Sequence, residues 1–237
     1  ISNIFSKMGS KSPLKYIHDR IALEARRMLY YADKPVKEVA YQLGFDDIQA
    51  FSRFFKKQEG ISPSEYKEKG NLGTIDNLKK AVGFVPNLYA YYAKNETALG
   101  DYLTLQNRKT TLKAKEKEVI NLVVSQFNGC NYCLSAHTQI GKMNGFTEDQ
   151  ILEIRTGAAS FDDKLHALAK FVLSTVQNKG KASEKVKEEF FAAGYTEANM
   201  IDVVIVIGDK TISNFIHNLA DFKIDFPLAE ELRTAAL

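Results

Sequence analysis

Apolar residues recur with helical spacing along almost the whole chain, and this periodicity limits the possible folds more than any other feature. Ile21, Ala25, Met28 and Leu29 fall at positions i, i+4, i+7 and i+8, which places them on one face of a helix. The same kind of spacing occurs in the stretches 36–43, 48–55, 119–127, 165–176, 186–191 and 200–216. The sequence therefore predicts an all-α protein.

One run competes with this interpretation. Val203–Ile207 consists of consecutive β-branched residues, as in a buried strand. Because the sequence offers no second strand candidate to pair with it, we interpret the run as part of a buried helix. It is also the longest unbroken aliphatic run, far short of the ~20 residues that span a bilayer, so we expect no membrane partner.

Cysteine content and the start of the chain bear on the compartment. Two cysteines are too few for a disulfide scaffold, so the fold must be held by its core. No basic stretch followed by an apolar one opens the chain, and we therefore expect no secretory signal. Together these features predict a cytoplasmic protein.

Charge is distributed unevenly between two parts of the chain. Residues 1–70 carry 13 Lys and Arg against 9 Asp and Glu, a net charge of +4, whereas residues 71–237 carry a net −1. A polar segment with two glycines, Lys67–Thr74, separates them and is typical of a linker. We expect two domains, 1–69 and 70–237. The basic part could meet a polyanion, or its charge could be an ordinary solvated face.

The basic part has the spacing of a helix–turn–helix. A helix over 36–43, a turn at Gly44 and a second helix over 46–58 are expected, with Asp46 as the N-cap of the second helix. Such a second helix can enter the major groove of DNA. The positions predicted to face outward and contact DNA are Asp47, Gln49, Ala50, Ser52, Arg53, Lys56 and Lys57.

Residues 1–69 resemble the AraC/XylS transcription regulators. The resemblance is carried mainly by Ala40–Lys57 with Gly60–Tyr66. Ser12–Ile17 and Arg20–Leu29 resemble the family's long linking helix. Ile1–Lys7 resembles the end of the recognition helix of a first unit. The resemblance implies DNA as a partner. Because the sequence holds one whole helix–turn–helix unit and only the end of another, we expect this chain to bind DNA weakly.

Both cysteines lie in one short motif. Cys130, Cys133 and His137 fall at i, i+3 and i+7, so they share one face of a helix. Asn128 and Gly129 break the preceding helix, which places Cys130 near a helix N-terminus, where a thiolate is stabilised. His137 could act as a base, and Glu118 on the preceding helix could polarise it.

Three interpretations of this cluster stay open. The cysteines could be small buried hydrophobes, or the set Cys130, Cys133, His137 and Glu118 could hold a structural zinc ion. A redox dithiol is favoured, because two thiols and a histidine provide both electrons and protons. His217, on the last long helix, is a weaker candidate for lining such a site.

The pattern Glu118-x11-Cys130-x2-Cys133-x3-His137 is similar to the active-site pattern of AhpD-like alkylhydroperoxidases in the carboxymuconolactone decarboxylase superfamily. Val85–Asn87, Gly145–Thr147 and Arg155-x-Gly157 agree with it, over about residues 75–230. The resemblance implies an all-α fold that assembles as a trimer or hexamer. It makes Cys133 the thiol that becomes a sulfenic acid, Cys130 the thiol that closes the disulfide, and Glu118 with His137 the proton relay.

One position departs from the family. Tyr132 stands where some members carry a second histidine, which implies a shorter relay. The function expected is a thiol-dependent hydroperoxide or disulfide reductase fused to an AraC-type segment, with no cofactor and no metal. Its partners would be a hydroperoxide and a redox protein or small thiol. The alternative is a transcription regulator whose dithiol senses peroxide.

Overall fold

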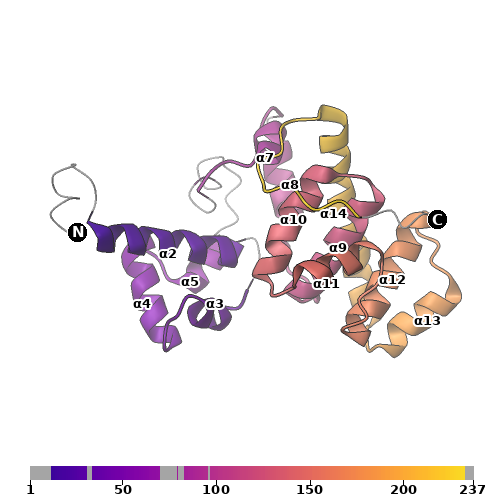
Figure 1. Ribbon diagram of the computed structural model, residues 1–237, viewed down its shortest axis with the longest axis horizontal. Coiled ribbons are helices and arrows are strands. Elements are labelled where there is room, and N and C mark those ends of the chain that lie inside the picture. Colours follow the sequence, from indigo (N-terminus) through magenta and orange to yellow (C-terminus); the bar gives the residue numbers. More distant parts are fainter. Residues whose placement is uncertain (1–11, 31–33, 70–78, 80–82, 96, 233–237) are drawn as a thin grey trace. The chain divides into compact units, whose positions relative to one another are not determined.

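The computed structural model describes residues 12–30, 34–69, 79, 83–95 and 97–232 (Figure 1). Every helix or strand assigned within these ranges is a helix, which confirms the all-α prediction. Val203–Ile207 lies inside a long helix, as interpreted, but only Val203 of the run is buried and Val204 is exposed, so the expectation of a buried segment is wrong for most of it. The chain divides into two compact units between Val85 and Pro86, and each unit is described by itself. The predicted boundary at residues 69 and 70 borders the segment 70–78, which lies outside the described residues.

The first unit contains a small helical core. Its helices are α2 (Pro13–Tyr30), α3 (Val36–Gln42), α4 (Ile48–Glu59) and α5 (Pro63–Lys69). Phe51 and Phe55, one turn apart on α4, are fully buried against Ala25 and Leu29 of α2 and Val39 of α3. An ion pair also joins α2 to α4, since the guanidinium of Arg26 lies 2.7 Å from the carboxylate of Glu59. The predicted stripes on these helices are thus the core-facing ones.

The turn between α3 and α4 differs from the prediction in one detail. Gly44 has φ = +82°, a left-handed conformation that glycine adopts without strain, as the predicted turn requires. The N-cap of α4 is Asp47 and not Asp46: its carboxylate accepts a hydrogen bond from the backbone N–H of Ala50 at 2.6 Å. The expected linker is also partly wrong, because residues 67–69 form the end of α5 and only 70–74 lie outside the described residues.

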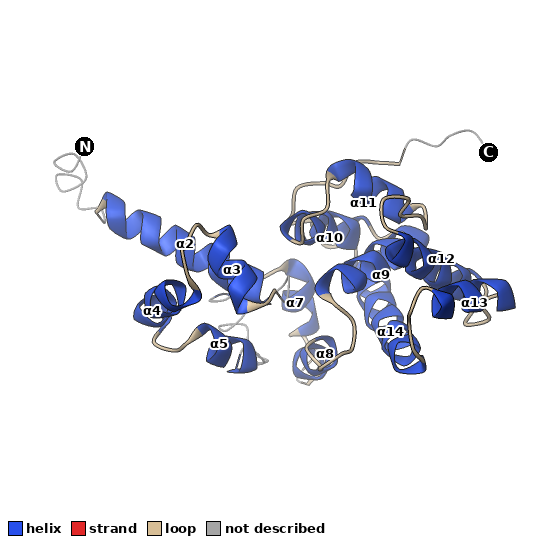
Figure 2. Cartoon of the chain, turned by 90° about the horizontal axis from the view of Figure 1, so that it is seen from below, coloured by secondary structure: helices blue, strands red, loops and turns tan. Residues whose placement is uncertain are grey.

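The second unit is built around one central helix. Its helices are α7 (Asn87–Tyr92), α8 (Ala98–Gln106), α9 (Ala114–Phe127), α10 (Asn131–Met143), α11 (Glu148–Arg155), α12 (Asp163–Gln177), α13 (Glu184–Ala192) and α14 (Glu197–Ala220). Helix α9 packs against α10, α11, α12 and α14, which surround it in Figure 2. Every residue of α9 from Glu118 to Ser125 is buried, as expected of a helix enclosed on all sides.

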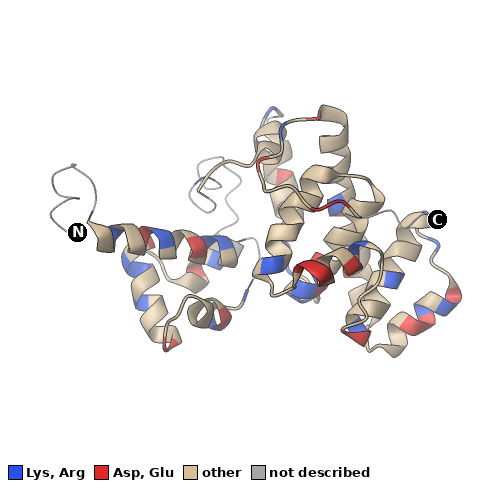
Figure 3. Ribbon diagram, in the orientation of Figure 1, with Lys and Arg blue, Asp and Glu red and all other residues tan. Residues whose placement is uncertain are grey.

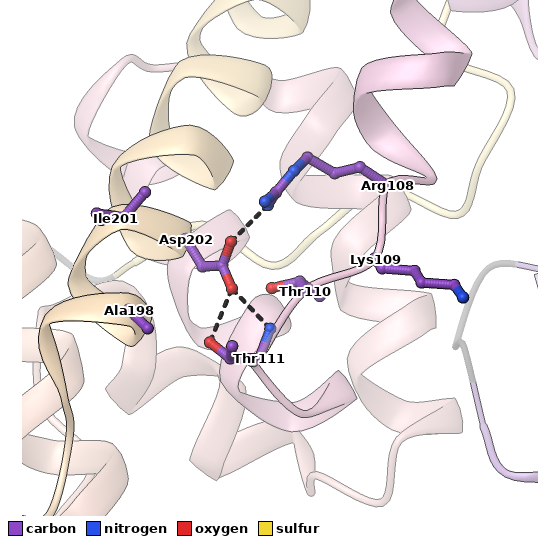
Figure 4. A pocket seen from close by; sticks show the side chains of 7 residues that line it. All are labelled: Arg108, Lys109, Thr110, Thr111, Ala198, Ile201 and Asp202. Carbon is purple, nitrogen blue, oxygen red and sulfur yellow. Dashed lines mark hydrogen bonds and ion pairs between the residues drawn. The ribbon is translucent and has the colours of Figure 1, made fainter.

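A buried carboxylate ties the segment before α9 to α14. Asp202, 4% exposed, accepts hydrogen bonds from the Arg108 guanidinium at 2.5 Å and from the backbone N–H and hydroxyl of Thr111 at 2.6 and 2.7 Å. These groups line an open pocket of about 420 Å³, in which the Lys109 side chain points away from Asp202 (Figure 4). Burial raises the pKa of Asp202, but the hydrogen bonds from Thr111 and Arg108 outweigh it and hold that pKa well below its usual range.

Among the described helices, none is by itself long and apolar enough to cross a membrane. Helices α13 and α14 reach that length and composition only when taken together, and the chain bends by 117° at the break between them.

We predict that Asp202→Asn lowers the free energy of unfolding by about 1–3 kcal/mol, because Arg108 then loses its charged partner. Asp101→Asn, at an exposed position on α8, is the control and should change stability little. Urea unfolding of the full chain measures both. Since the pKa of Asp202 is depressed on folding, its contribution is complete above the ordinary aspartate pKa of about 3.9 and is lost as the pH falls through the folded value. An unchanged midpoint at pH 7 would contradict this role.

Candidate functional site

The two cysteines lie at the tight turn between α9 and α10. Gly129 has φ = +63°, so the chain reverses there, and the backbone N–H of Cys130 donates to the carbonyl oxygen of Ser125 at 3.0 Å. Cys130 is the N-cap of α10, and its Sγ accepts a hydrogen bond from the backbone N–H of Cys133 at 3.4 Å. Both cysteines are free thiols and both are buried. The spacing thus brings the thiols together, with Cys130 just before the helix.

A buried carboxylate–imidazole pair lies beside the dithiol. His137 Nδ1 lies 2.8 Å from Glu118 Oε2, and both side chains are almost fully buried. The other oxygen of Glu118 accepts a hydrogen bond from the amide of Asn121 at 3.0 Å, which fixes the orientation of the carboxylate. With the Nδ1 proton directed at Glu118, Nε2 is the imidazole nitrogen left to exchange a proton. The predicted pairing of Glu118 with His137 is therefore present.

The environment makes the two thiols unequal. The hydrogen bond from the Cys130 thiol lowers the pKa of Cys133 to about 6; burial opposes this, and the charges of Lys210 and His137 assist it. The same hydrogen bond, together with burial, raises the pKa of Cys130 well above its usual range. The prediction that the helix N-terminus favours a thiolate at Cys130 is thus wrong in its choice of residue. Cys130 acts as the donor, and the negative charge is favoured on Cys133.

The zinc interpretation finds no support in the geometry. Within the part of the chain that the structure describes, no group of three or more His, Cys, Asp and Glu side chains is arranged to hold a metal ion. The Glu118 carboxylate is held by His137 Nδ1 and by the Asn121 amide, so it is not available as a fourth ligand beside the two thiols.

Helix α14 contributes side chains that the sequence analysis missed. Ser213 Oγ lies 4.0 Å from Cys133 Sγ, and the buried amide of Asn214 bonds to Ser125 and Asn128 at the turn before Cys130. Lys210, one turn earlier, is also buried. The available signal was a set of polar residues at i, i+3 and i+4, which places Lys210, Ser213 and Asn214 on one face of the helix.

Tyr132 is held by packing contacts and a hydrogen bond to the backbone. Its hydroxyl accepts a hydrogen bond from the backbone N–H of Leu88 on α7 at 3.2 Å, and its ring packs against His217, Phe222 and Phe226. Burial raises the pKa of Tyr132 above its usual range. His217 therefore borders the site through Tyr132, while its Nε2 lies 3.1 Å from the carbonyl oxygen of Phe222.

The predicted DNA-contacting residues lie along α4, where Lys and Arg are marked in Figure 3. Exposed members of the set are Asp47, Gln49, Arg53, Lys56 and Lys57, and Ala50 and Ser52 are half-buried. The Asp47 carboxylate is already used as the helix cap. Contact of these residues with DNA stays a prediction.

Comparison with known families assigns both parts of the chain. Residues 1–69 match the family described as helix-turn-helix domain, and residues 93–172 match the carboxymuconolactone decarboxylase family. The second match contains Glu118, Cys130, Cys133 and His137 but ends before α14. The chain joins an AraC-type helix–turn–helix domain to an AhpD-like domain.

Curated relatives match over short lengths. An uncharacterized HTH-type transcriptional regulator of Bacillus subtilis, YobQ, is 38% identical over 66 residues, which cover 28% of this chain and 27% of that protein. The arabinose operon regulatory protein of Escherichia coli is 36% identical over 67 residues, 28% of this chain and 23% of that protein. The chain thus spans about a quarter of the length of these relatives.

Solved structures share the AhpD-like fold. An uncharacterized peroxidase-related protein from a Silicibacter species gives a TM-score of 0.60 at 20% identity, over 72% of this chain and 90% of that one. An alkylhydroperoxidase AhpD core protein from Ralstonia eutropha gives 0.56 at 20% identity, over 66% and 83%. The debrominase Bmp8 gives 0.55 at 18% identity, over 68% and 88%. At these identities the likeness establishes the fold alone.

We predict that iodoacetamide modifies Cys133 of the AhpD-like domain before Cys130 at mildly acidic pH. Only the thiolate reacts, so the rate at Cys133 should rise with pH through a midpoint of about 6 and level off above it. Burial slows access equally at every pH and leaves the midpoint unchanged. Fragment-ion mass spectrometry assigns the modified cysteine. Modification of Cys130 first, or a midpoint near the usual cysteine pKa of about 8.5, would refute the assigned asymmetry.

Proposed function

We propose that the AhpD-like domain is a thiol-dependent hydroperoxide reductase in which Cys133 is the reacting thiol. The observation that carries the proposal is the asymmetric dithiol: Cys130 donates a hydrogen bond that lowers the pKa of Cys133 to about 6. A thiolate is the nucleophilic form of cysteine, and it is populated at neutral pH at such a site. The Glu118–His137 pair supports the proposal by supplying a proton acceptor and donor in the same buried region.

The proposed reaction has three balanced steps. The Cys133 thiolate attacks one peroxide oxygen, an S–O bond forms as the O–O bond breaks, and the alcohol leaves after taking a proton; Cys133 is thereby oxidised to a sulfenic acid. Cys130 then attacks that sulfur, a disulfide forms and water leaves. An external dithiol reduces the disulfide and is itself oxidised.

The Glu118–His137 pair has a defined task in the second step. Because the pKa of Cys130 is raised, this thiol must give up its proton to become a nucleophile. We propose that His137, whose charge acts on Cys133, is the base that accepts it. Glu118 stabilises the imidazolium that results.

We infer that the helix–turn–helix domain contacts DNA through α4. Exposed Arg53, Lys56 and Lys57 give this helix a basic face, and the curated relatives named above include a regulator of the arabinose operon. DNA binding and reduced thiols both suit a cytoplasmic location, which we propose for the protein. We also propose a homo-oligomer, trimer or hexamer, for which α14 offers exposed apolar side chains at Ile201, Val204, Ile212, Phe215 and Leu219.

A redox-sensing regulator is the second candidate function. The match of residues 1–69 to a helix–turn–helix family favours it, since one chain then carries both a DNA-binding fold and an oxidisable dithiol. A sensor requires a single oxidation that changes DNA affinity, whereas an enzyme requires repeated reduction of the disulfide by a dithiol.

For the enzyme, we predict that Cys133→Ser abolishes peroxide consumption in the presence of dithiothreitol. Cys130→Ser should allow one oxidation and leave a sulfenic acid that dimedone traps, because the thiol that closes the disulfide is gone. Peroxide loss and intact mass are measured on the full chain, with Ser135→Ala on the same helix as the control. Steady turnover by Cys133→Ser would exclude the proposed nucleophile.

For the DNA-binding part, we predict binding that weakens steeply as salt is raised, because it depends on contacts of Lys and Arg with phosphate. Arg53→Ala should weaken binding to all duplexes if it meets phosphate, or cost about 1–3 kcal/mol on one sequence if it reads a base. Fluorescence anisotropy at two salt concentrations measures this, with Lys185→Ala in the AhpD-like domain as the control.

Titrations of DNA with reduced and with peroxide-treated protein separate the sensor from the enzyme, because a sensor changes its DNA affinity on oxidation. Binding that does not depend on Arg53, Lys56 or Lys57 would eliminate α4 as the contact.

A further inference from the structure

A buried lysine lies on the face of α14 that meets the dithiol. The Lys210 side chain belongs to a residue only 3% exposed, and Ser213 and Asn214 on the next turn are fully buried. These positions are related by i, i+3 and i+4, so they share one face of the helix. Lysine is rarely buried to this extent without a specific reason, because its charge must leave water.

The contacts of this face hold α14 in a fixed position relative to Cys133. Cys133 Sγ lies 4.0 Å from Ser213 Oγ, whose hydroxyl donates to the carbonyl oxygen of Lys210 at 3.0 Å. Asn214 donates to Ser125 Oγ at 3.2 Å and accepts from Asn128 at 2.9 Å, at the turn that leads into Cys130. The backbone that carries Lys210 is thereby tied to the dithiol from two sides.

The charge of Lys210 acts on both thiols. It lowers the pKa of Cys133 and works in the same direction at Cys130. Within the described residues, no carboxylate forms an ion pair with its ammonium group. The adjacent Asp209 carboxylate acts instead on Tyr92 and Tyr102 of α7 and α8.

Other groups also face Cys133. They are the Cys130 thiol, His137 and Tyr132 on α10, Tyr92 on α7, and the uncharged Ser213 and Asn214 on α14. Among them Cys130 and Asn214 act by hydrogen bonds, and both tyrosines are neutral, since burial raises their pKa values. Lys210 and His137 are the two that bring positive charge, and the imidazole of His137 is paired with the Glu118 carboxylate.

We propose that Lys210 is a positioning residue that acts through its fixed positive charge to keep Cys133 in the thiolate form. This inference rests on the proposed role of Cys133 as the reacting thiol. It assigns a function to α14, a helix that lies outside the family match at residues 93–172.

The test compares Lys210→Met with Lys210→Arg in the full chain. The iodoacetamide rate at Cys133 is measured from pH 5 to 9, and circular dichroism verifies the fold. An opposite charge at close range lowers a pKa by about 1–3 units, so Lys210→Met should move the midpoint upward by about one unit or more. Near pH 6 the rate should fall about fivefold or more. Lys210→Arg should keep the midpoint close to that of the unchanged protein. Lys185→Met, at an 84% exposed side chain, is the matched control and should have no effect.

Two results would overturn the proposal: an unshifted midpoint in folded Lys210→Met, or an equal shift in folded Lys210→Arg. If the methionine variant does not fold, Lys210→Gln replaces it. The unchanged protein supplies a further measurement, because salt screens a buried charge weakly. The Cys133 midpoint should therefore stay constant between 50 and 500 mM salt, and a strong rise would point to a surface cation and exclude Lys210.

Peroxide consumption measured in parallel separates this inference from the proposed function. A midpoint that depends on Lys210, in a protein that consumes no peroxide, would leave the electrostatic role standing and reject the peroxidase. Peroxide consumption with a midpoint that does not depend on Lys210 would support the peroxidase and reject the electrostatic role of Lys210.

Discussion

The enclosure of α9 on every side is the constraint on which the AhpD-like domain depends. A helix with no solvent-facing residues from Glu118 to Ser125 must be surrounded, and α10, α11, α12 and α14 surround it. The same enclosure removes the Glu118 carboxylate from water, which is costly unless the charge is paired. His137 and Asn121 provide that pairing. The core and the candidate site therefore depend on each other, because burying α9 also buries the Glu118 carboxylate, which then needs the imidazole as a partner.

The inequality of the two thiols follows from where the helix begins. Cys130, as the N-cap, has its sulfur beside the backbone N–H of Cys133, while its own proton is directed at the Cys133 sulfur. Cys133 is one turn further on and meets α14, where Ser213 and Lys210 lie. A difference of three positions thus separates a donor from an acceptor. Chemistry of the kind proposed needs this division, since one thiol must be ionised first and the other must keep its proton until later.

Much of this architecture could be predicted from local sequence, and the failures have local reasons too. Periodicity predicted the helices because apolar stripes are set by core burial, as at Phe51 and Phe55. Asp46 and Asp47 are equally good caps in sequence, and only the backbone conformation at Asp47 selects one. The pairing of Glu118 with His137 was predictable from the motif. The contribution of Lys210 was not, because Lys210 follows the motif by more than 70 residues and tertiary packing alone brings α14 to Cys133.

Helix α14 forms hydrogen bonds at both ends of α9, and we call these two sets of contacts its grips. Asp202 holds Thr111 just before α9, and Asn214 and Asn218 hold Asn128 just after it. With a rise of 1.5 Å per residue, the 14 residues of α9 span about 21 Å, and α14 covers about 18–24 Å between its two grips. The stretch of α14 between these contacts thus matches α9 in length, and the two helices run parallel. A single-residue insertion or deletion in either helix would turn all later side chains by about 100° and bring one grip out of register. The contacts at the two ends of α9 therefore fix the number of residues between them in both helices.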